Sequence, residues 1–379
     1  MKAHQPPKHY RLEHPVALGS FLSWVRTSVQ GGCVVPRYLP KYLFVCLCTL
    51  LTSPLRGWEW MRFDARKRAT VVHHSPVFII GHWRSGTTHL HNLLVQDERF
   101  CFMSTFQAMA PGFCLSGDRL LKPALESIAR RRYPTRLIDN IPLAFDAPQE
   151  DEFAMACLTH RAFIHTFSFP KHAERFFDQF VMLDQQTQVA REHWMSTYCR
   201  LLRMIQFRGG ARRMVLKNCA HTGRIRTLLA QFPNARFIHI HRNPYEVFLS
   251  SMHMHRTVLK TSQLQHTDAQ AIRRRVLQFY ERLMKHLIDV RPELSANQFI
   301  DVAFEDLERD PLAQIERIYR QLELGKLQAV RPRIEQYLST IAGYRKNAYV
   351  LDQETIETVN QHWGFALDSL GYDRIESIS

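Results

Sequence analysis

The sequence predicts an α/β protein in which helices flank a central parallel sheet. The first observation is the short apolar run Val77–Ile80, whose β-branched and aromatic residues without polar alternation are typical of a buried strand. The second is the helical pattern that follows, in which Leu90, Leu93 and Leu94 share one face. The third is a repeat of this order further along the chain. Strands that alternate with helices pair in parallel through right-handed crossovers.

The repeat occupies residues 214–251. An apolar strand, Met214–Leu216, ends at Lys217 and is followed by a helix. A second strand, Phe237–Ile240, leads to Arg242 and then to another helix. Arg242 therefore stands just past a strand end, where open α/β sheets bind their ligands. Ser250 lies eight positions later, about two helical turns on, so both side chains could reach one phosphate.

The turn between the first strand and its helix has the composition of an anion-binding loop. Free backbone N–H groups and the positive end of the helix dipole meet at such a turn. The residues expected to bind a phosphate-like group, through a positive charge, hydroxyl groups or backbone N–H groups, are Arg84, Ser85, Gly86, Thr87 and Thr88.

The loop differs from a nucleotide P-loop at one position. Gly81 and Gly86 have the P-loop spacing, but Thr87 stands where an ATPase needs its lysine, which disfavours a P-loop kinase. The run Arg-Ser-Gly-Thr-Thr after a strand instead resembles the 5′-phosphosulfate loop of sulfotransferases. Taken alone, the loop has an ordinary strand–turn–helix corner as its less favoured alternative.

Two further stretches resemble the same family. Arg242 followed by Ser250, with Ser251 as a neighbouring candidate, resembles the 3′-phosphate motif of sulfotransferases, and Phe232–Arg236 resembles its lead-in. Residues Phe304–Leu307 resemble the family's [YF]-E-D-L strand end. The three matches cover residues 76–325 in the family's order. Their pattern is closest to the bacterial-type and tyrosylprotein-like sulfotransferases.

This resemblance implies a P-loop NTPase-like sulfotransferase fold and a sulfuryl donor, 3′-phosphoadenosine 5′-phosphosulfate (PAPS), with no metal. The implied reaction is sulfuryl transfer to a hydroxyl or amine. The sequence suggests a hydrophobic or lipid-linked acceptor, although sugar hydroxyls and peptide tyrosines stay open. A catalytically silent nucleotide-binding scaffold is the alternative from another functional class.

The catalytic groups are inferred by analogy with phosphoryl transfer, in which positioning and charge stabilisation dominate. Arg84 and Lys217 are expected to supply positive charge. Lys217 resembles the lysine of the N-K-D-P stretch in tyrosylprotein sulfotransferases, although Asn218 and Cys219 replace the Asp-Pro part.

No family motif identifies the general base, because Met103–Phe106 stands where related families carry a glutamate. The candidates for the base are Glu150, Asp151, Glu152 and His221. A helix starting at Asp146 or Pro148 would carry the three acids in its first turn, where capping alone also explains them. Helix capping or core packing is the favoured explanation of His221, so the acidic cluster is preferred for the base.

The rest of the catalytic domain, residues 76–379, contains an insert at about residues 97–213. Its aromatic residues form either core or an acceptor pocket, and the helical, aromatic segment 161–208 is expected to shape the acceptor site. Near the C-terminus, Arg345 and Lys346 could close over the cofactor phosphates, as C-terminal loops do in related enzymes, or form a basic surface turn.

Residues 1–75 form an N-terminal extension. Its apolar stretch, Tyr42–Leu51, is too short to span a bilayer. Trp58, Trp60 and several arginines flank it, which suits a membrane interface, while packing on the domain or on a second subunit is the plainer alternative.

Composition limits the partners and the compartment. The chain has 379 residues and a net charge of +15, which suits an anionic small molecule or an anionic membrane. The sequence contains no basic segment interleaved with aromatic residues, so it does not indicate a nucleic-acid partner. The eight cysteines are scattered without zinc-site spacing, which predicts thiols in a reducing, cytoplasmic compartment. The sequence gives no indication of oligomeric state.

Overall fold

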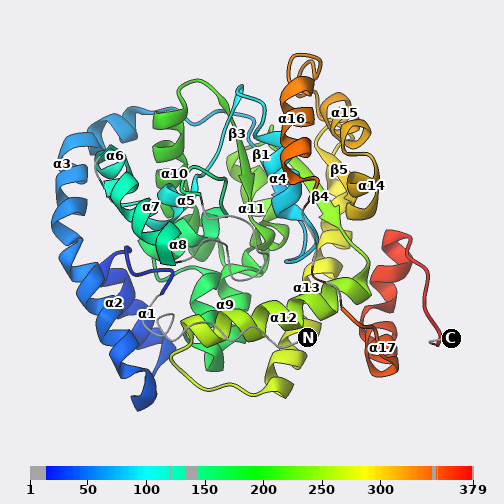
Figure 1. The fold of residues 1–379 in the computed structure, drawn as a ribbon, viewed down its shortest axis with the longest axis horizontal. Helices are drawn as coiled ribbons and strands as arrows, with labels where there is room; N and C mark the ends of the chain where they lie inside the picture. The colour runs from blue at the N-terminus through cyan, green and yellow to red at the C-terminus, as the bar shows by residue number, and fades with distance from the viewer. Residues whose placement is uncertain (1–13, 120, 133–143, 344–346, 348, 378–379) are drawn as a thin grey trace.

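The computed structural model describes residues 14–119, 121–132, 144–343, 347 and 349–377. Its centre is a five-stranded sheet in the order β2-β3-β1-β4-β5, with every pairing parallel (Figure 1). The strands are β1 (Val77–Ile80), β2 (Phe100–Cys101), β3 (Arg213–Lys217), β4 (Arg236–His241) and β5 (Phe299–Ala303). In the middle strand, Val77 pairs with Val215 on one side and Arg236 on the other. The predicted central parallel sheet is confirmed.

The strands alternate their side chains between two hydrophobic clusters, one on each face of the sheet. Phe78 and Ile80 belong to the larger cluster, and Val77 and Ile79 belong to the smaller one. All four side chains of β1 are fully buried, two on each face of the sheet. The strand is therefore apolar at every position instead of alternating between apolar and polar residues.

Helices cover both faces. The smaller cluster is closed by α4 (Thr87–Leu94), α14 (Phe304–Arg309), α15 (Pro311–Gln321) and α16 (Arg331–Ile341). The larger cluster includes residues of α8 (Asp151–Leu158), α9 (Ala173–Phe180), α10 (Gln188–Gly209), α11 (Ile225–Gln231), α12 (Pro244–Ser262), α13 (Ala269–Val290) and α17 (Gln353–Leu370). The remaining helices of the insert are α5 (Thr105–Met109), α6 (Cys114–Gly117) and α7 (Leu121–Arg132). Single 3-10 turns are η2 (Pro36–Tyr38), η3 (Phe163–Phe167), η4 (Pro170–His172), η5 (Leu183–Gln185), η6 (Cys219–Gly223) and η7 (Arg291–Glu293).

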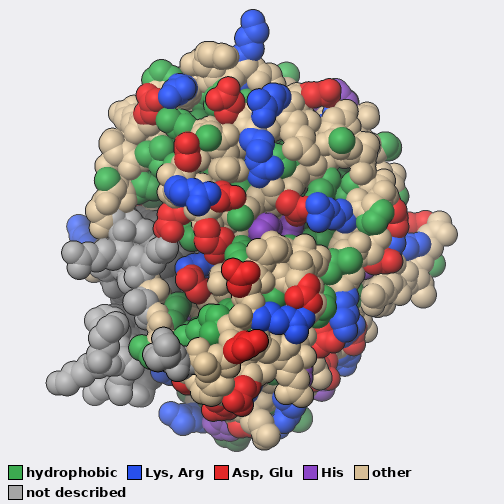
Figure 2. Space-filling model, turned by 90° about the vertical axis from the view of Figure 1, so that its right-hand side faces the viewer, with side chains coloured by type: hydrophobic (Ala, Val, Ile, Leu, Met, Phe, Trp, Pro, Cys, Tyr) green, Lys and Arg blue, Asp and Glu red, His purple; other side chains and the backbone are tan. Residues whose placement is uncertain are grey.

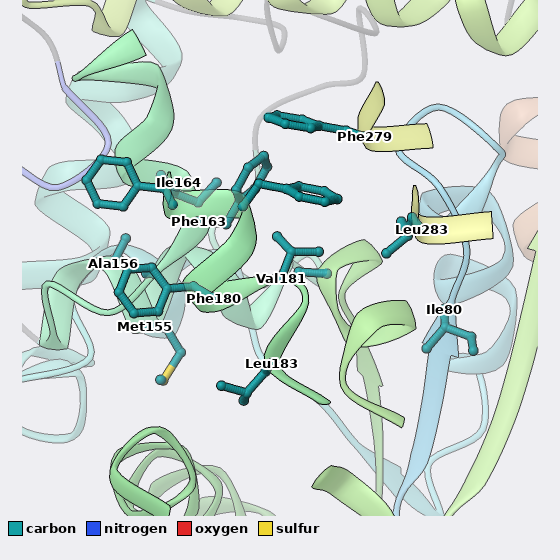
Figure 3. Packing of buried hydrophobic residues seen from close by; sticks show 14 of the residues in the cluster. Ile80, Met155, Ala156, Phe163, Ile164, Phe180, Val181, Leu183, Phe279 and Leu283 are labelled. Carbon is teal, nitrogen blue, oxygen red and sulfur yellow. The ribbon is translucent and has the colours of Figure 1, made fainter. Parts of the chain in front are cut away.

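The aromatic residues of the insert are mainly core. Phe163 and Phe180 pack with Val181, Leu183 and Phe279 in the larger cluster (Figure 3). Phe106 and Phe113 are likewise buried. Of the two interpretations of this aromatic patch, core packing is therefore the one that the structure supports.

The N-terminal helices α1 (Phe21–Gly31), α2 (Leu39–Leu51) and α3 (Ser53–Ala69) pack onto the same core, to which they contribute Trp24 and Val45. The helical stretch Pro36–Ala69 is, by length and composition, long and apolar enough to cross a membrane. The ten-residue segment expected from the sequence is thus part of a longer helical stretch. The domain boundary near residue 75 stays a prediction.

Gly81 permits the close approach of β1 and β4 at the start of the phosphate loop. Its φ is +142°, and a Cβ atom there would lie 2.3 Å from the carbonyl oxygen of Ile240. We expect Gly81→Ala to lower the free energy of unfolding by about 2–4 kcal/mol, because backbone strain and steric overlap add. Urea denaturation measures this change.

The matched control is Gly210→Ala. Gly210 also has a positive φ, +65°, but a Cβ atom there would meet nothing within 4 Å. Its expected cost is about 1 kcal/mol, from the backbone conformation alone. Equal losses in the two variants would contradict the role given to the Ile240 contact.

Candidate active site

The phosphate loop joins β1 to α4 through residues with unusual backbone angles. Arg84 has a φ of +76° and Gly86 a φ of +97°. A positive φ at a non-glycine residue such as Arg84 is a strained conformation that often marks functional sites. The turn points the chain into α4, whose first N–H groups have no partner within the helix. The predicted strand–loop–helix arrangement is confirmed.

Hydrogen bonds hold this loop from inside and from the 3-10 turn η6 that follows β3. The Ser85 hydroxyl donates to the His82 carbonyl oxygen at 2.8 Å. The Thr222 hydroxyl accepts from the Gly81 N–H at 2.9 Å and lies 3.0 Å from the Gly81 oxygen, to which it donates. Burial lowers the pKa of His82 to about 3, so this ring is neutral at physiological pH. The hydrogen bonds of Ser85 and Thr222 therefore hold the loop through protein contacts alone.

Two of the predicted motifs meet at Arg84 and Ser250. The Arg84 Nε donates to the Ser250 hydroxyl at 2.9 Å, across 166 positions of sequence. The hydroxyl of Tyr349 lies 3.3 Å from the same Ser250 oxygen. The neighbouring Ser251 hydroxyl is buried without a hydrogen-bond partner among the described residues. Ser250 lies within α12, two turns after the strand end, as the spacing predicts.

The third motif supports the other two through Phe304. The Arg242 guanidinium lies over the Phe304 ring, 4.7 Å from its centroid, and also donates to Glu246. A Cβ atom at Gly86 would come within 2.2 Å of the same ring. The Arg242 Nε is buried and has no hydrogen-bond partner in the described part of the chain. One aromatic ring thus packs against both the loop and the arginine.

Lys217 and Glu150 form a partly open ion pair beside the loop. Their Nζ and Oε1 atoms are 2.8 Å apart, and the side chains are 4% and 11% exposed. The Cys219 sulfur lies 3.6 Å from the Glu150 Oε1 and 3.7 Å from the Thr87 hydroxyl. This chain of contacts connects the pair to the first residue of α4.

The expected helix start is corrected by the structure. The helix α8 begins at Asp151 rather than at Asp146 or Pro148, so Glu150 is the N-cap residue and two acids, not three, lie in the first turn. The Glu150 side chain makes no capping hydrogen bond. The isolated bridge between Ser104 and Pro148 keeps residues before Glu150 extended. Capping therefore does not account for this glutamate.

Asp151 and His221 are engaged with Tyr198 in the interior. The Tyr198 hydroxyl donates to the Asp151 Oδ2 at 2.6 Å and lies 2.8 Å from the His221 Nε2. The His221 Nε2 is 3.1 Å from the same carboxylate, and Asn218 donates to the other oxygen. Burial alone would raise the pKa of Asp151, but the attraction and hydrogen bond of His221 hold it below its ordinary value. Both side chains are fully buried.

Glu152 is paired with Arg224 in the same network. Arg224 donates to both carboxylate oxygens, at 2.8 and 3.2 Å, while Asn218 and the Phe163 N–H donate at 2.8 and 2.6 Å. The guanidinium also lies over the Trp194 ring, 4.5 Å from its centroid. Burial would raise the pKa of Glu152, but the charge of Arg224 and these hydrogen bonds hold it below its ordinary value.

The structure thus brings most of the predicted residues together around one loop. Arg345 and Lys346 lie outside the described residues. Sequence reasoning missed the supporting residues Tyr198, Arg224, Thr222 and Tyr349, whose partners are 23 to 141 positions away. The sequence did indicate Phe304, because this residue begins the third motif. Within the described ranges, no cluster of three or more metal-binding side chains was found.

Known proteins resemble the chain over most of its length. A model of the sulfotransferase family matches residues 76–327. Over 358 residues, 94% of this chain and 90% of the relative, the chain is 33% identical to omega-hydroxy-beta-dihydromenaquinone-9 sulfotransferase Stf3 of Mycobacterium bovis, and equally to the protein of that name from Mycobacterium tuberculosis.

Solved structures show the same fold. The sulfotransferase STF9 of Mycobacterium avium aligns with a TM-score of 0.71 at 19% identity, over 94% of this chain and 91% of its own. The sulfotransferase STF1 of Mycobacterium tuberculosis aligns with a TM-score of 0.64 at 20% identity, over 94% of this chain and 92% of its own. From the family match and the 33% identical relative together, the chain belongs to the sulfotransferase family and is a sulfotransferase enzyme.

Proposed function

We propose that this sulfotransferase moves the sulfuryl group of PAPS to a hydroxyl group of a lipid-like acceptor. The observation that carries the proposal is the hydrogen bond between Arg84 and Ser250, because it joins the loop motif to the 3′-phosphate motif in one site. A donor with phosphate groups at both ends of one adenosine needs both motifs at once. ATP, without a 3′-phosphate, needs only the loop.

Buried polar atoms support the fit to this donor. The Arg242 Nε and the Ser251 hydroxyl have no hydrogen-bond partner in the described chain, and unsatisfied buried groups are rare in native proteins. We assign the 3′-phosphate to Arg242 and Ser250, with Ser251 beside them. The 5′-phosphosulfate is assigned to Arg84 and to the N–H and hydroxyl groups of residues 85–88.

The C-terminal segment is included in the cofactor site. The Tyr349 hydroxyl lies 3.3 Å from the Ser250 oxygen, so the chain immediately after Arg345 and Lys346 reaches the 3′-phosphate motif. This contact supports the assignment of the two basic residues to the donor phosphates. Their positive charges would add to those of Arg84 and Arg242.

For the transfer step, we assign the general base to Glu150. The other candidates, Asp151, Glu152 and His221, are fully buried and already hydrogen-bonded, whereas Glu150 keeps some exposure beside the loop. When bound, the donor supplies an activated sulfuryl group. Glu150 then holds the proton of the acceptor hydroxyl on its carboxylate, and Lys217 supplies positive charge where negative charge develops.

The acceptor class rests on the relative and on the surface of the chain. Stf3 is named for an omega-hydroxylated dihydromenaquinone, which is an isoprenoid alcohol. We therefore infer an apolar alcohol for this chain too. All eight cysteines are free thiols, which supports a cytoplasmic enzyme. An acceptor of this kind resides in membranes, so the proposal includes peripheral contact with an anionic membrane.

The donor site is tested by calorimetry with 3′,5′-adenosine bisphosphate and with ATP plus magnesium. We expect the wild type to prefer the bisphosphate. Arg242→Ala should weaken its binding about 10- to 100-fold, the loss expected when a hydrogen-bonded charge is removed.

The control is Glu246→Gln, which removes the carboxylate that Arg242 contacts in the structure. This variant should bind the bisphosphate as well as the wild type or more tightly. Preference for ATP in the wild type would overturn the PAPS assignment.

The base is tested by Glu150→Gln. We expect kcat for transfer of labelled sulfate from PAPS to a prenyl alcohol to fall about 10²- to 10⁴-fold, because the proton acceptor is lost. Binding of the bisphosphate should be unchanged. Sugar and tyrosine-peptide acceptors are assayed beside the prenyl alcohol, and faster transfer to either would refute the lipid-like class. Unchanged kcat in Glu150→Gln would exclude this residue as the base.

Glu152→Gln should instead destabilise the fold, since it leaves the buried Arg224 without its counter-charge. The expected loss is about 3–5 kcal/mol at neutral pH. The folded state holds the pKa of Glu152 below its ordinary value, so the carboxylate stabilises the protein above that ordinary value. This stabilisation is lost as the pH falls through the lowered pKa. Urea denaturation at several pH values should show a smaller acid-induced loss in Glu152→Gln than in the wild type.

A further inference from the structure

The helices α2 and α3 carry a continuous row of exposed apolar side chains. We call this row the apolar ridge; it comprises Leu43, Leu47, Leu50, Leu51, Trp58 and Met61, which are 53–69% exposed. Successive members are one, three, four or seven residues apart, which places them on one helical face that continues across the junction at Thr52. Single exposed apolar residues are ordinary, but a contiguous row marks an interaction surface.

The opposite face of the same helices is fixed to the protein. Lys41 is buried and donates to the Thr261 carbonyl oxygen, and Val45 and Thr49 are fully buried. The buried Glu59 accepts from the N–H groups of Leu115 and Ser116, each at 2.9 Å. The two helices therefore lie lengthwise along one edge of the molecule (Figure 1), with the ridge side open to solvent. This placement fits a helix in a membrane interface better than one that crosses a bilayer.

A basic groove runs beside the ridge. It has a volume of about 1460 Å³ and is lined by residues of α1, α3 and α10 and by the end of α8. Arg26, Arg161, Arg200 and Arg203 line this groove, and the side chain of none of them forms a hydrogen bond or ion pair with another described residue. Of the two acids that line the groove, Asp64 pairs with Arg68, and Glu192 accepts a hydrogen bond from the neutral Gln188 amide, so one uncompensated negative charge faces the four arginines.

The opposite side of the molecule has a different surface. There, basic and acidic side chains are interspersed (Figure 2). Many arginines elsewhere in the chain have acidic partners, as Arg333 has with Glu98 at 2.7 Å. Four arginines without an acidic partner thus lie together in the groove, next to the apolar ridge. This combination matches the surface of a bilayer that contains acidic lipids.

The groove and the active site lie at opposite ends of one short helix. Glu150 precedes α8, and Leu158, Thr159 and Arg161 at its other end line the groove. Eight helical residues span about 12 Å. Two hydrogen bonds of 2.7 Å hold α1 to this end, from the Ser20 N–H to the Cys157 oxygen and from the Ser23 hydroxyl to the Leu158 oxygen.

We propose that the apolar ridge and the basic groove together dock the enzyme on a bilayer containing acidic phospholipids. The ridge side chains enter the interface between head groups and acyl chains, and the four arginines contact lipid phosphates. The inference deepens the proposed function, on which it rests for the class of acceptor, because it places the active site about one helix length from the membrane that holds such an alcohol.

The test is co-sedimentation of the full chain with vesicles, without PAPS or acceptor. The vesicles contain phosphatidylcholine alone or phosphatidylcholine with phosphatidylglycerol. We expect the wild type to bind the acidic vesicles at least about tenfold more tightly than the neutral ones. The groove variant Arg200→Glu with Arg203→Glu, and the ridge variant Leu47→Ser with Leu50→Ser, should each weaken binding to acidic vesicles at least about tenfold.

A matched control reverses two exposed charges beyond the far edge of the sheet, Arg320→Glu with Lys326→Glu, and should bind as the wild type does. Thermal unfolding and bisphosphate binding confirm that each variant is folded. Equal binding to both vesicle types, or an equal loss in the control, would overturn the proposal. If the ridge variant changes the oligomeric state in sedimentation while keeping its vesicle binding, the ridge is a subunit interface instead. If the donor-site assignment is wrong, calorimetry with the bisphosphate will show it, and the result with vesicles will be unaffected.

Discussion

The structure depends on one buried ionic network that joins the start of α8 to the loop after β3. Asp151 and Glu152 are taken out of water completely, and their carboxylates remain charged only because Asn218, His221 and Arg224 lie against them. Asn218 contacts both acids and caps the following 3-10 turn. Since Lys217 and Glu150 are the adjacent residues on these two segments, the network sets the position of their ion pair.

The phosphate loop has a separate support. Its shape requires positive φ at Arg84 and Gly86, and the Phe304 ring fills the space next to Gly86. The same ring lies under Arg242, while Arg84 contacts Ser250. Thus β1, β4 and β5 each place a group at the same edge of the sheet, because parallel strands end there together. The donor site follows from the topology, whereas the acceptor side depends on the insert that carries α8.

The sequence predicted the central sheet, the loop and the position of Ser250, because apolar runs, glycines and a fixed spacing are local signals. It did not distinguish Glu150 from Asp151 and Glu152. Three adjacent acids look alike in sequence, and only their side-chain partners, which lie 47 to 72 positions away, separate them. The start of α8 was placed too early for a related reason. The bridge between Ser104 and Pro148 keeps that segment extended, and such long-range pairing leaves no local pattern.

The helix α8 connects the active site with the proposed membrane-docking surface. A single helix begins at the active site and ends at the basic groove, and its start is held by the buried ionic network. Because its other end is held by α1, a surface that docks through α1, α2 and α3 cannot move far relative to Glu150. An enzyme acting on a water-soluble acceptor would gain nothing from this coupling. For an apolar alcohol held in a bilayer, this coupling fixes the distance between Glu150 and the membrane surface. That distance decides whether the hydroxyl group of the alcohol can reach the general base.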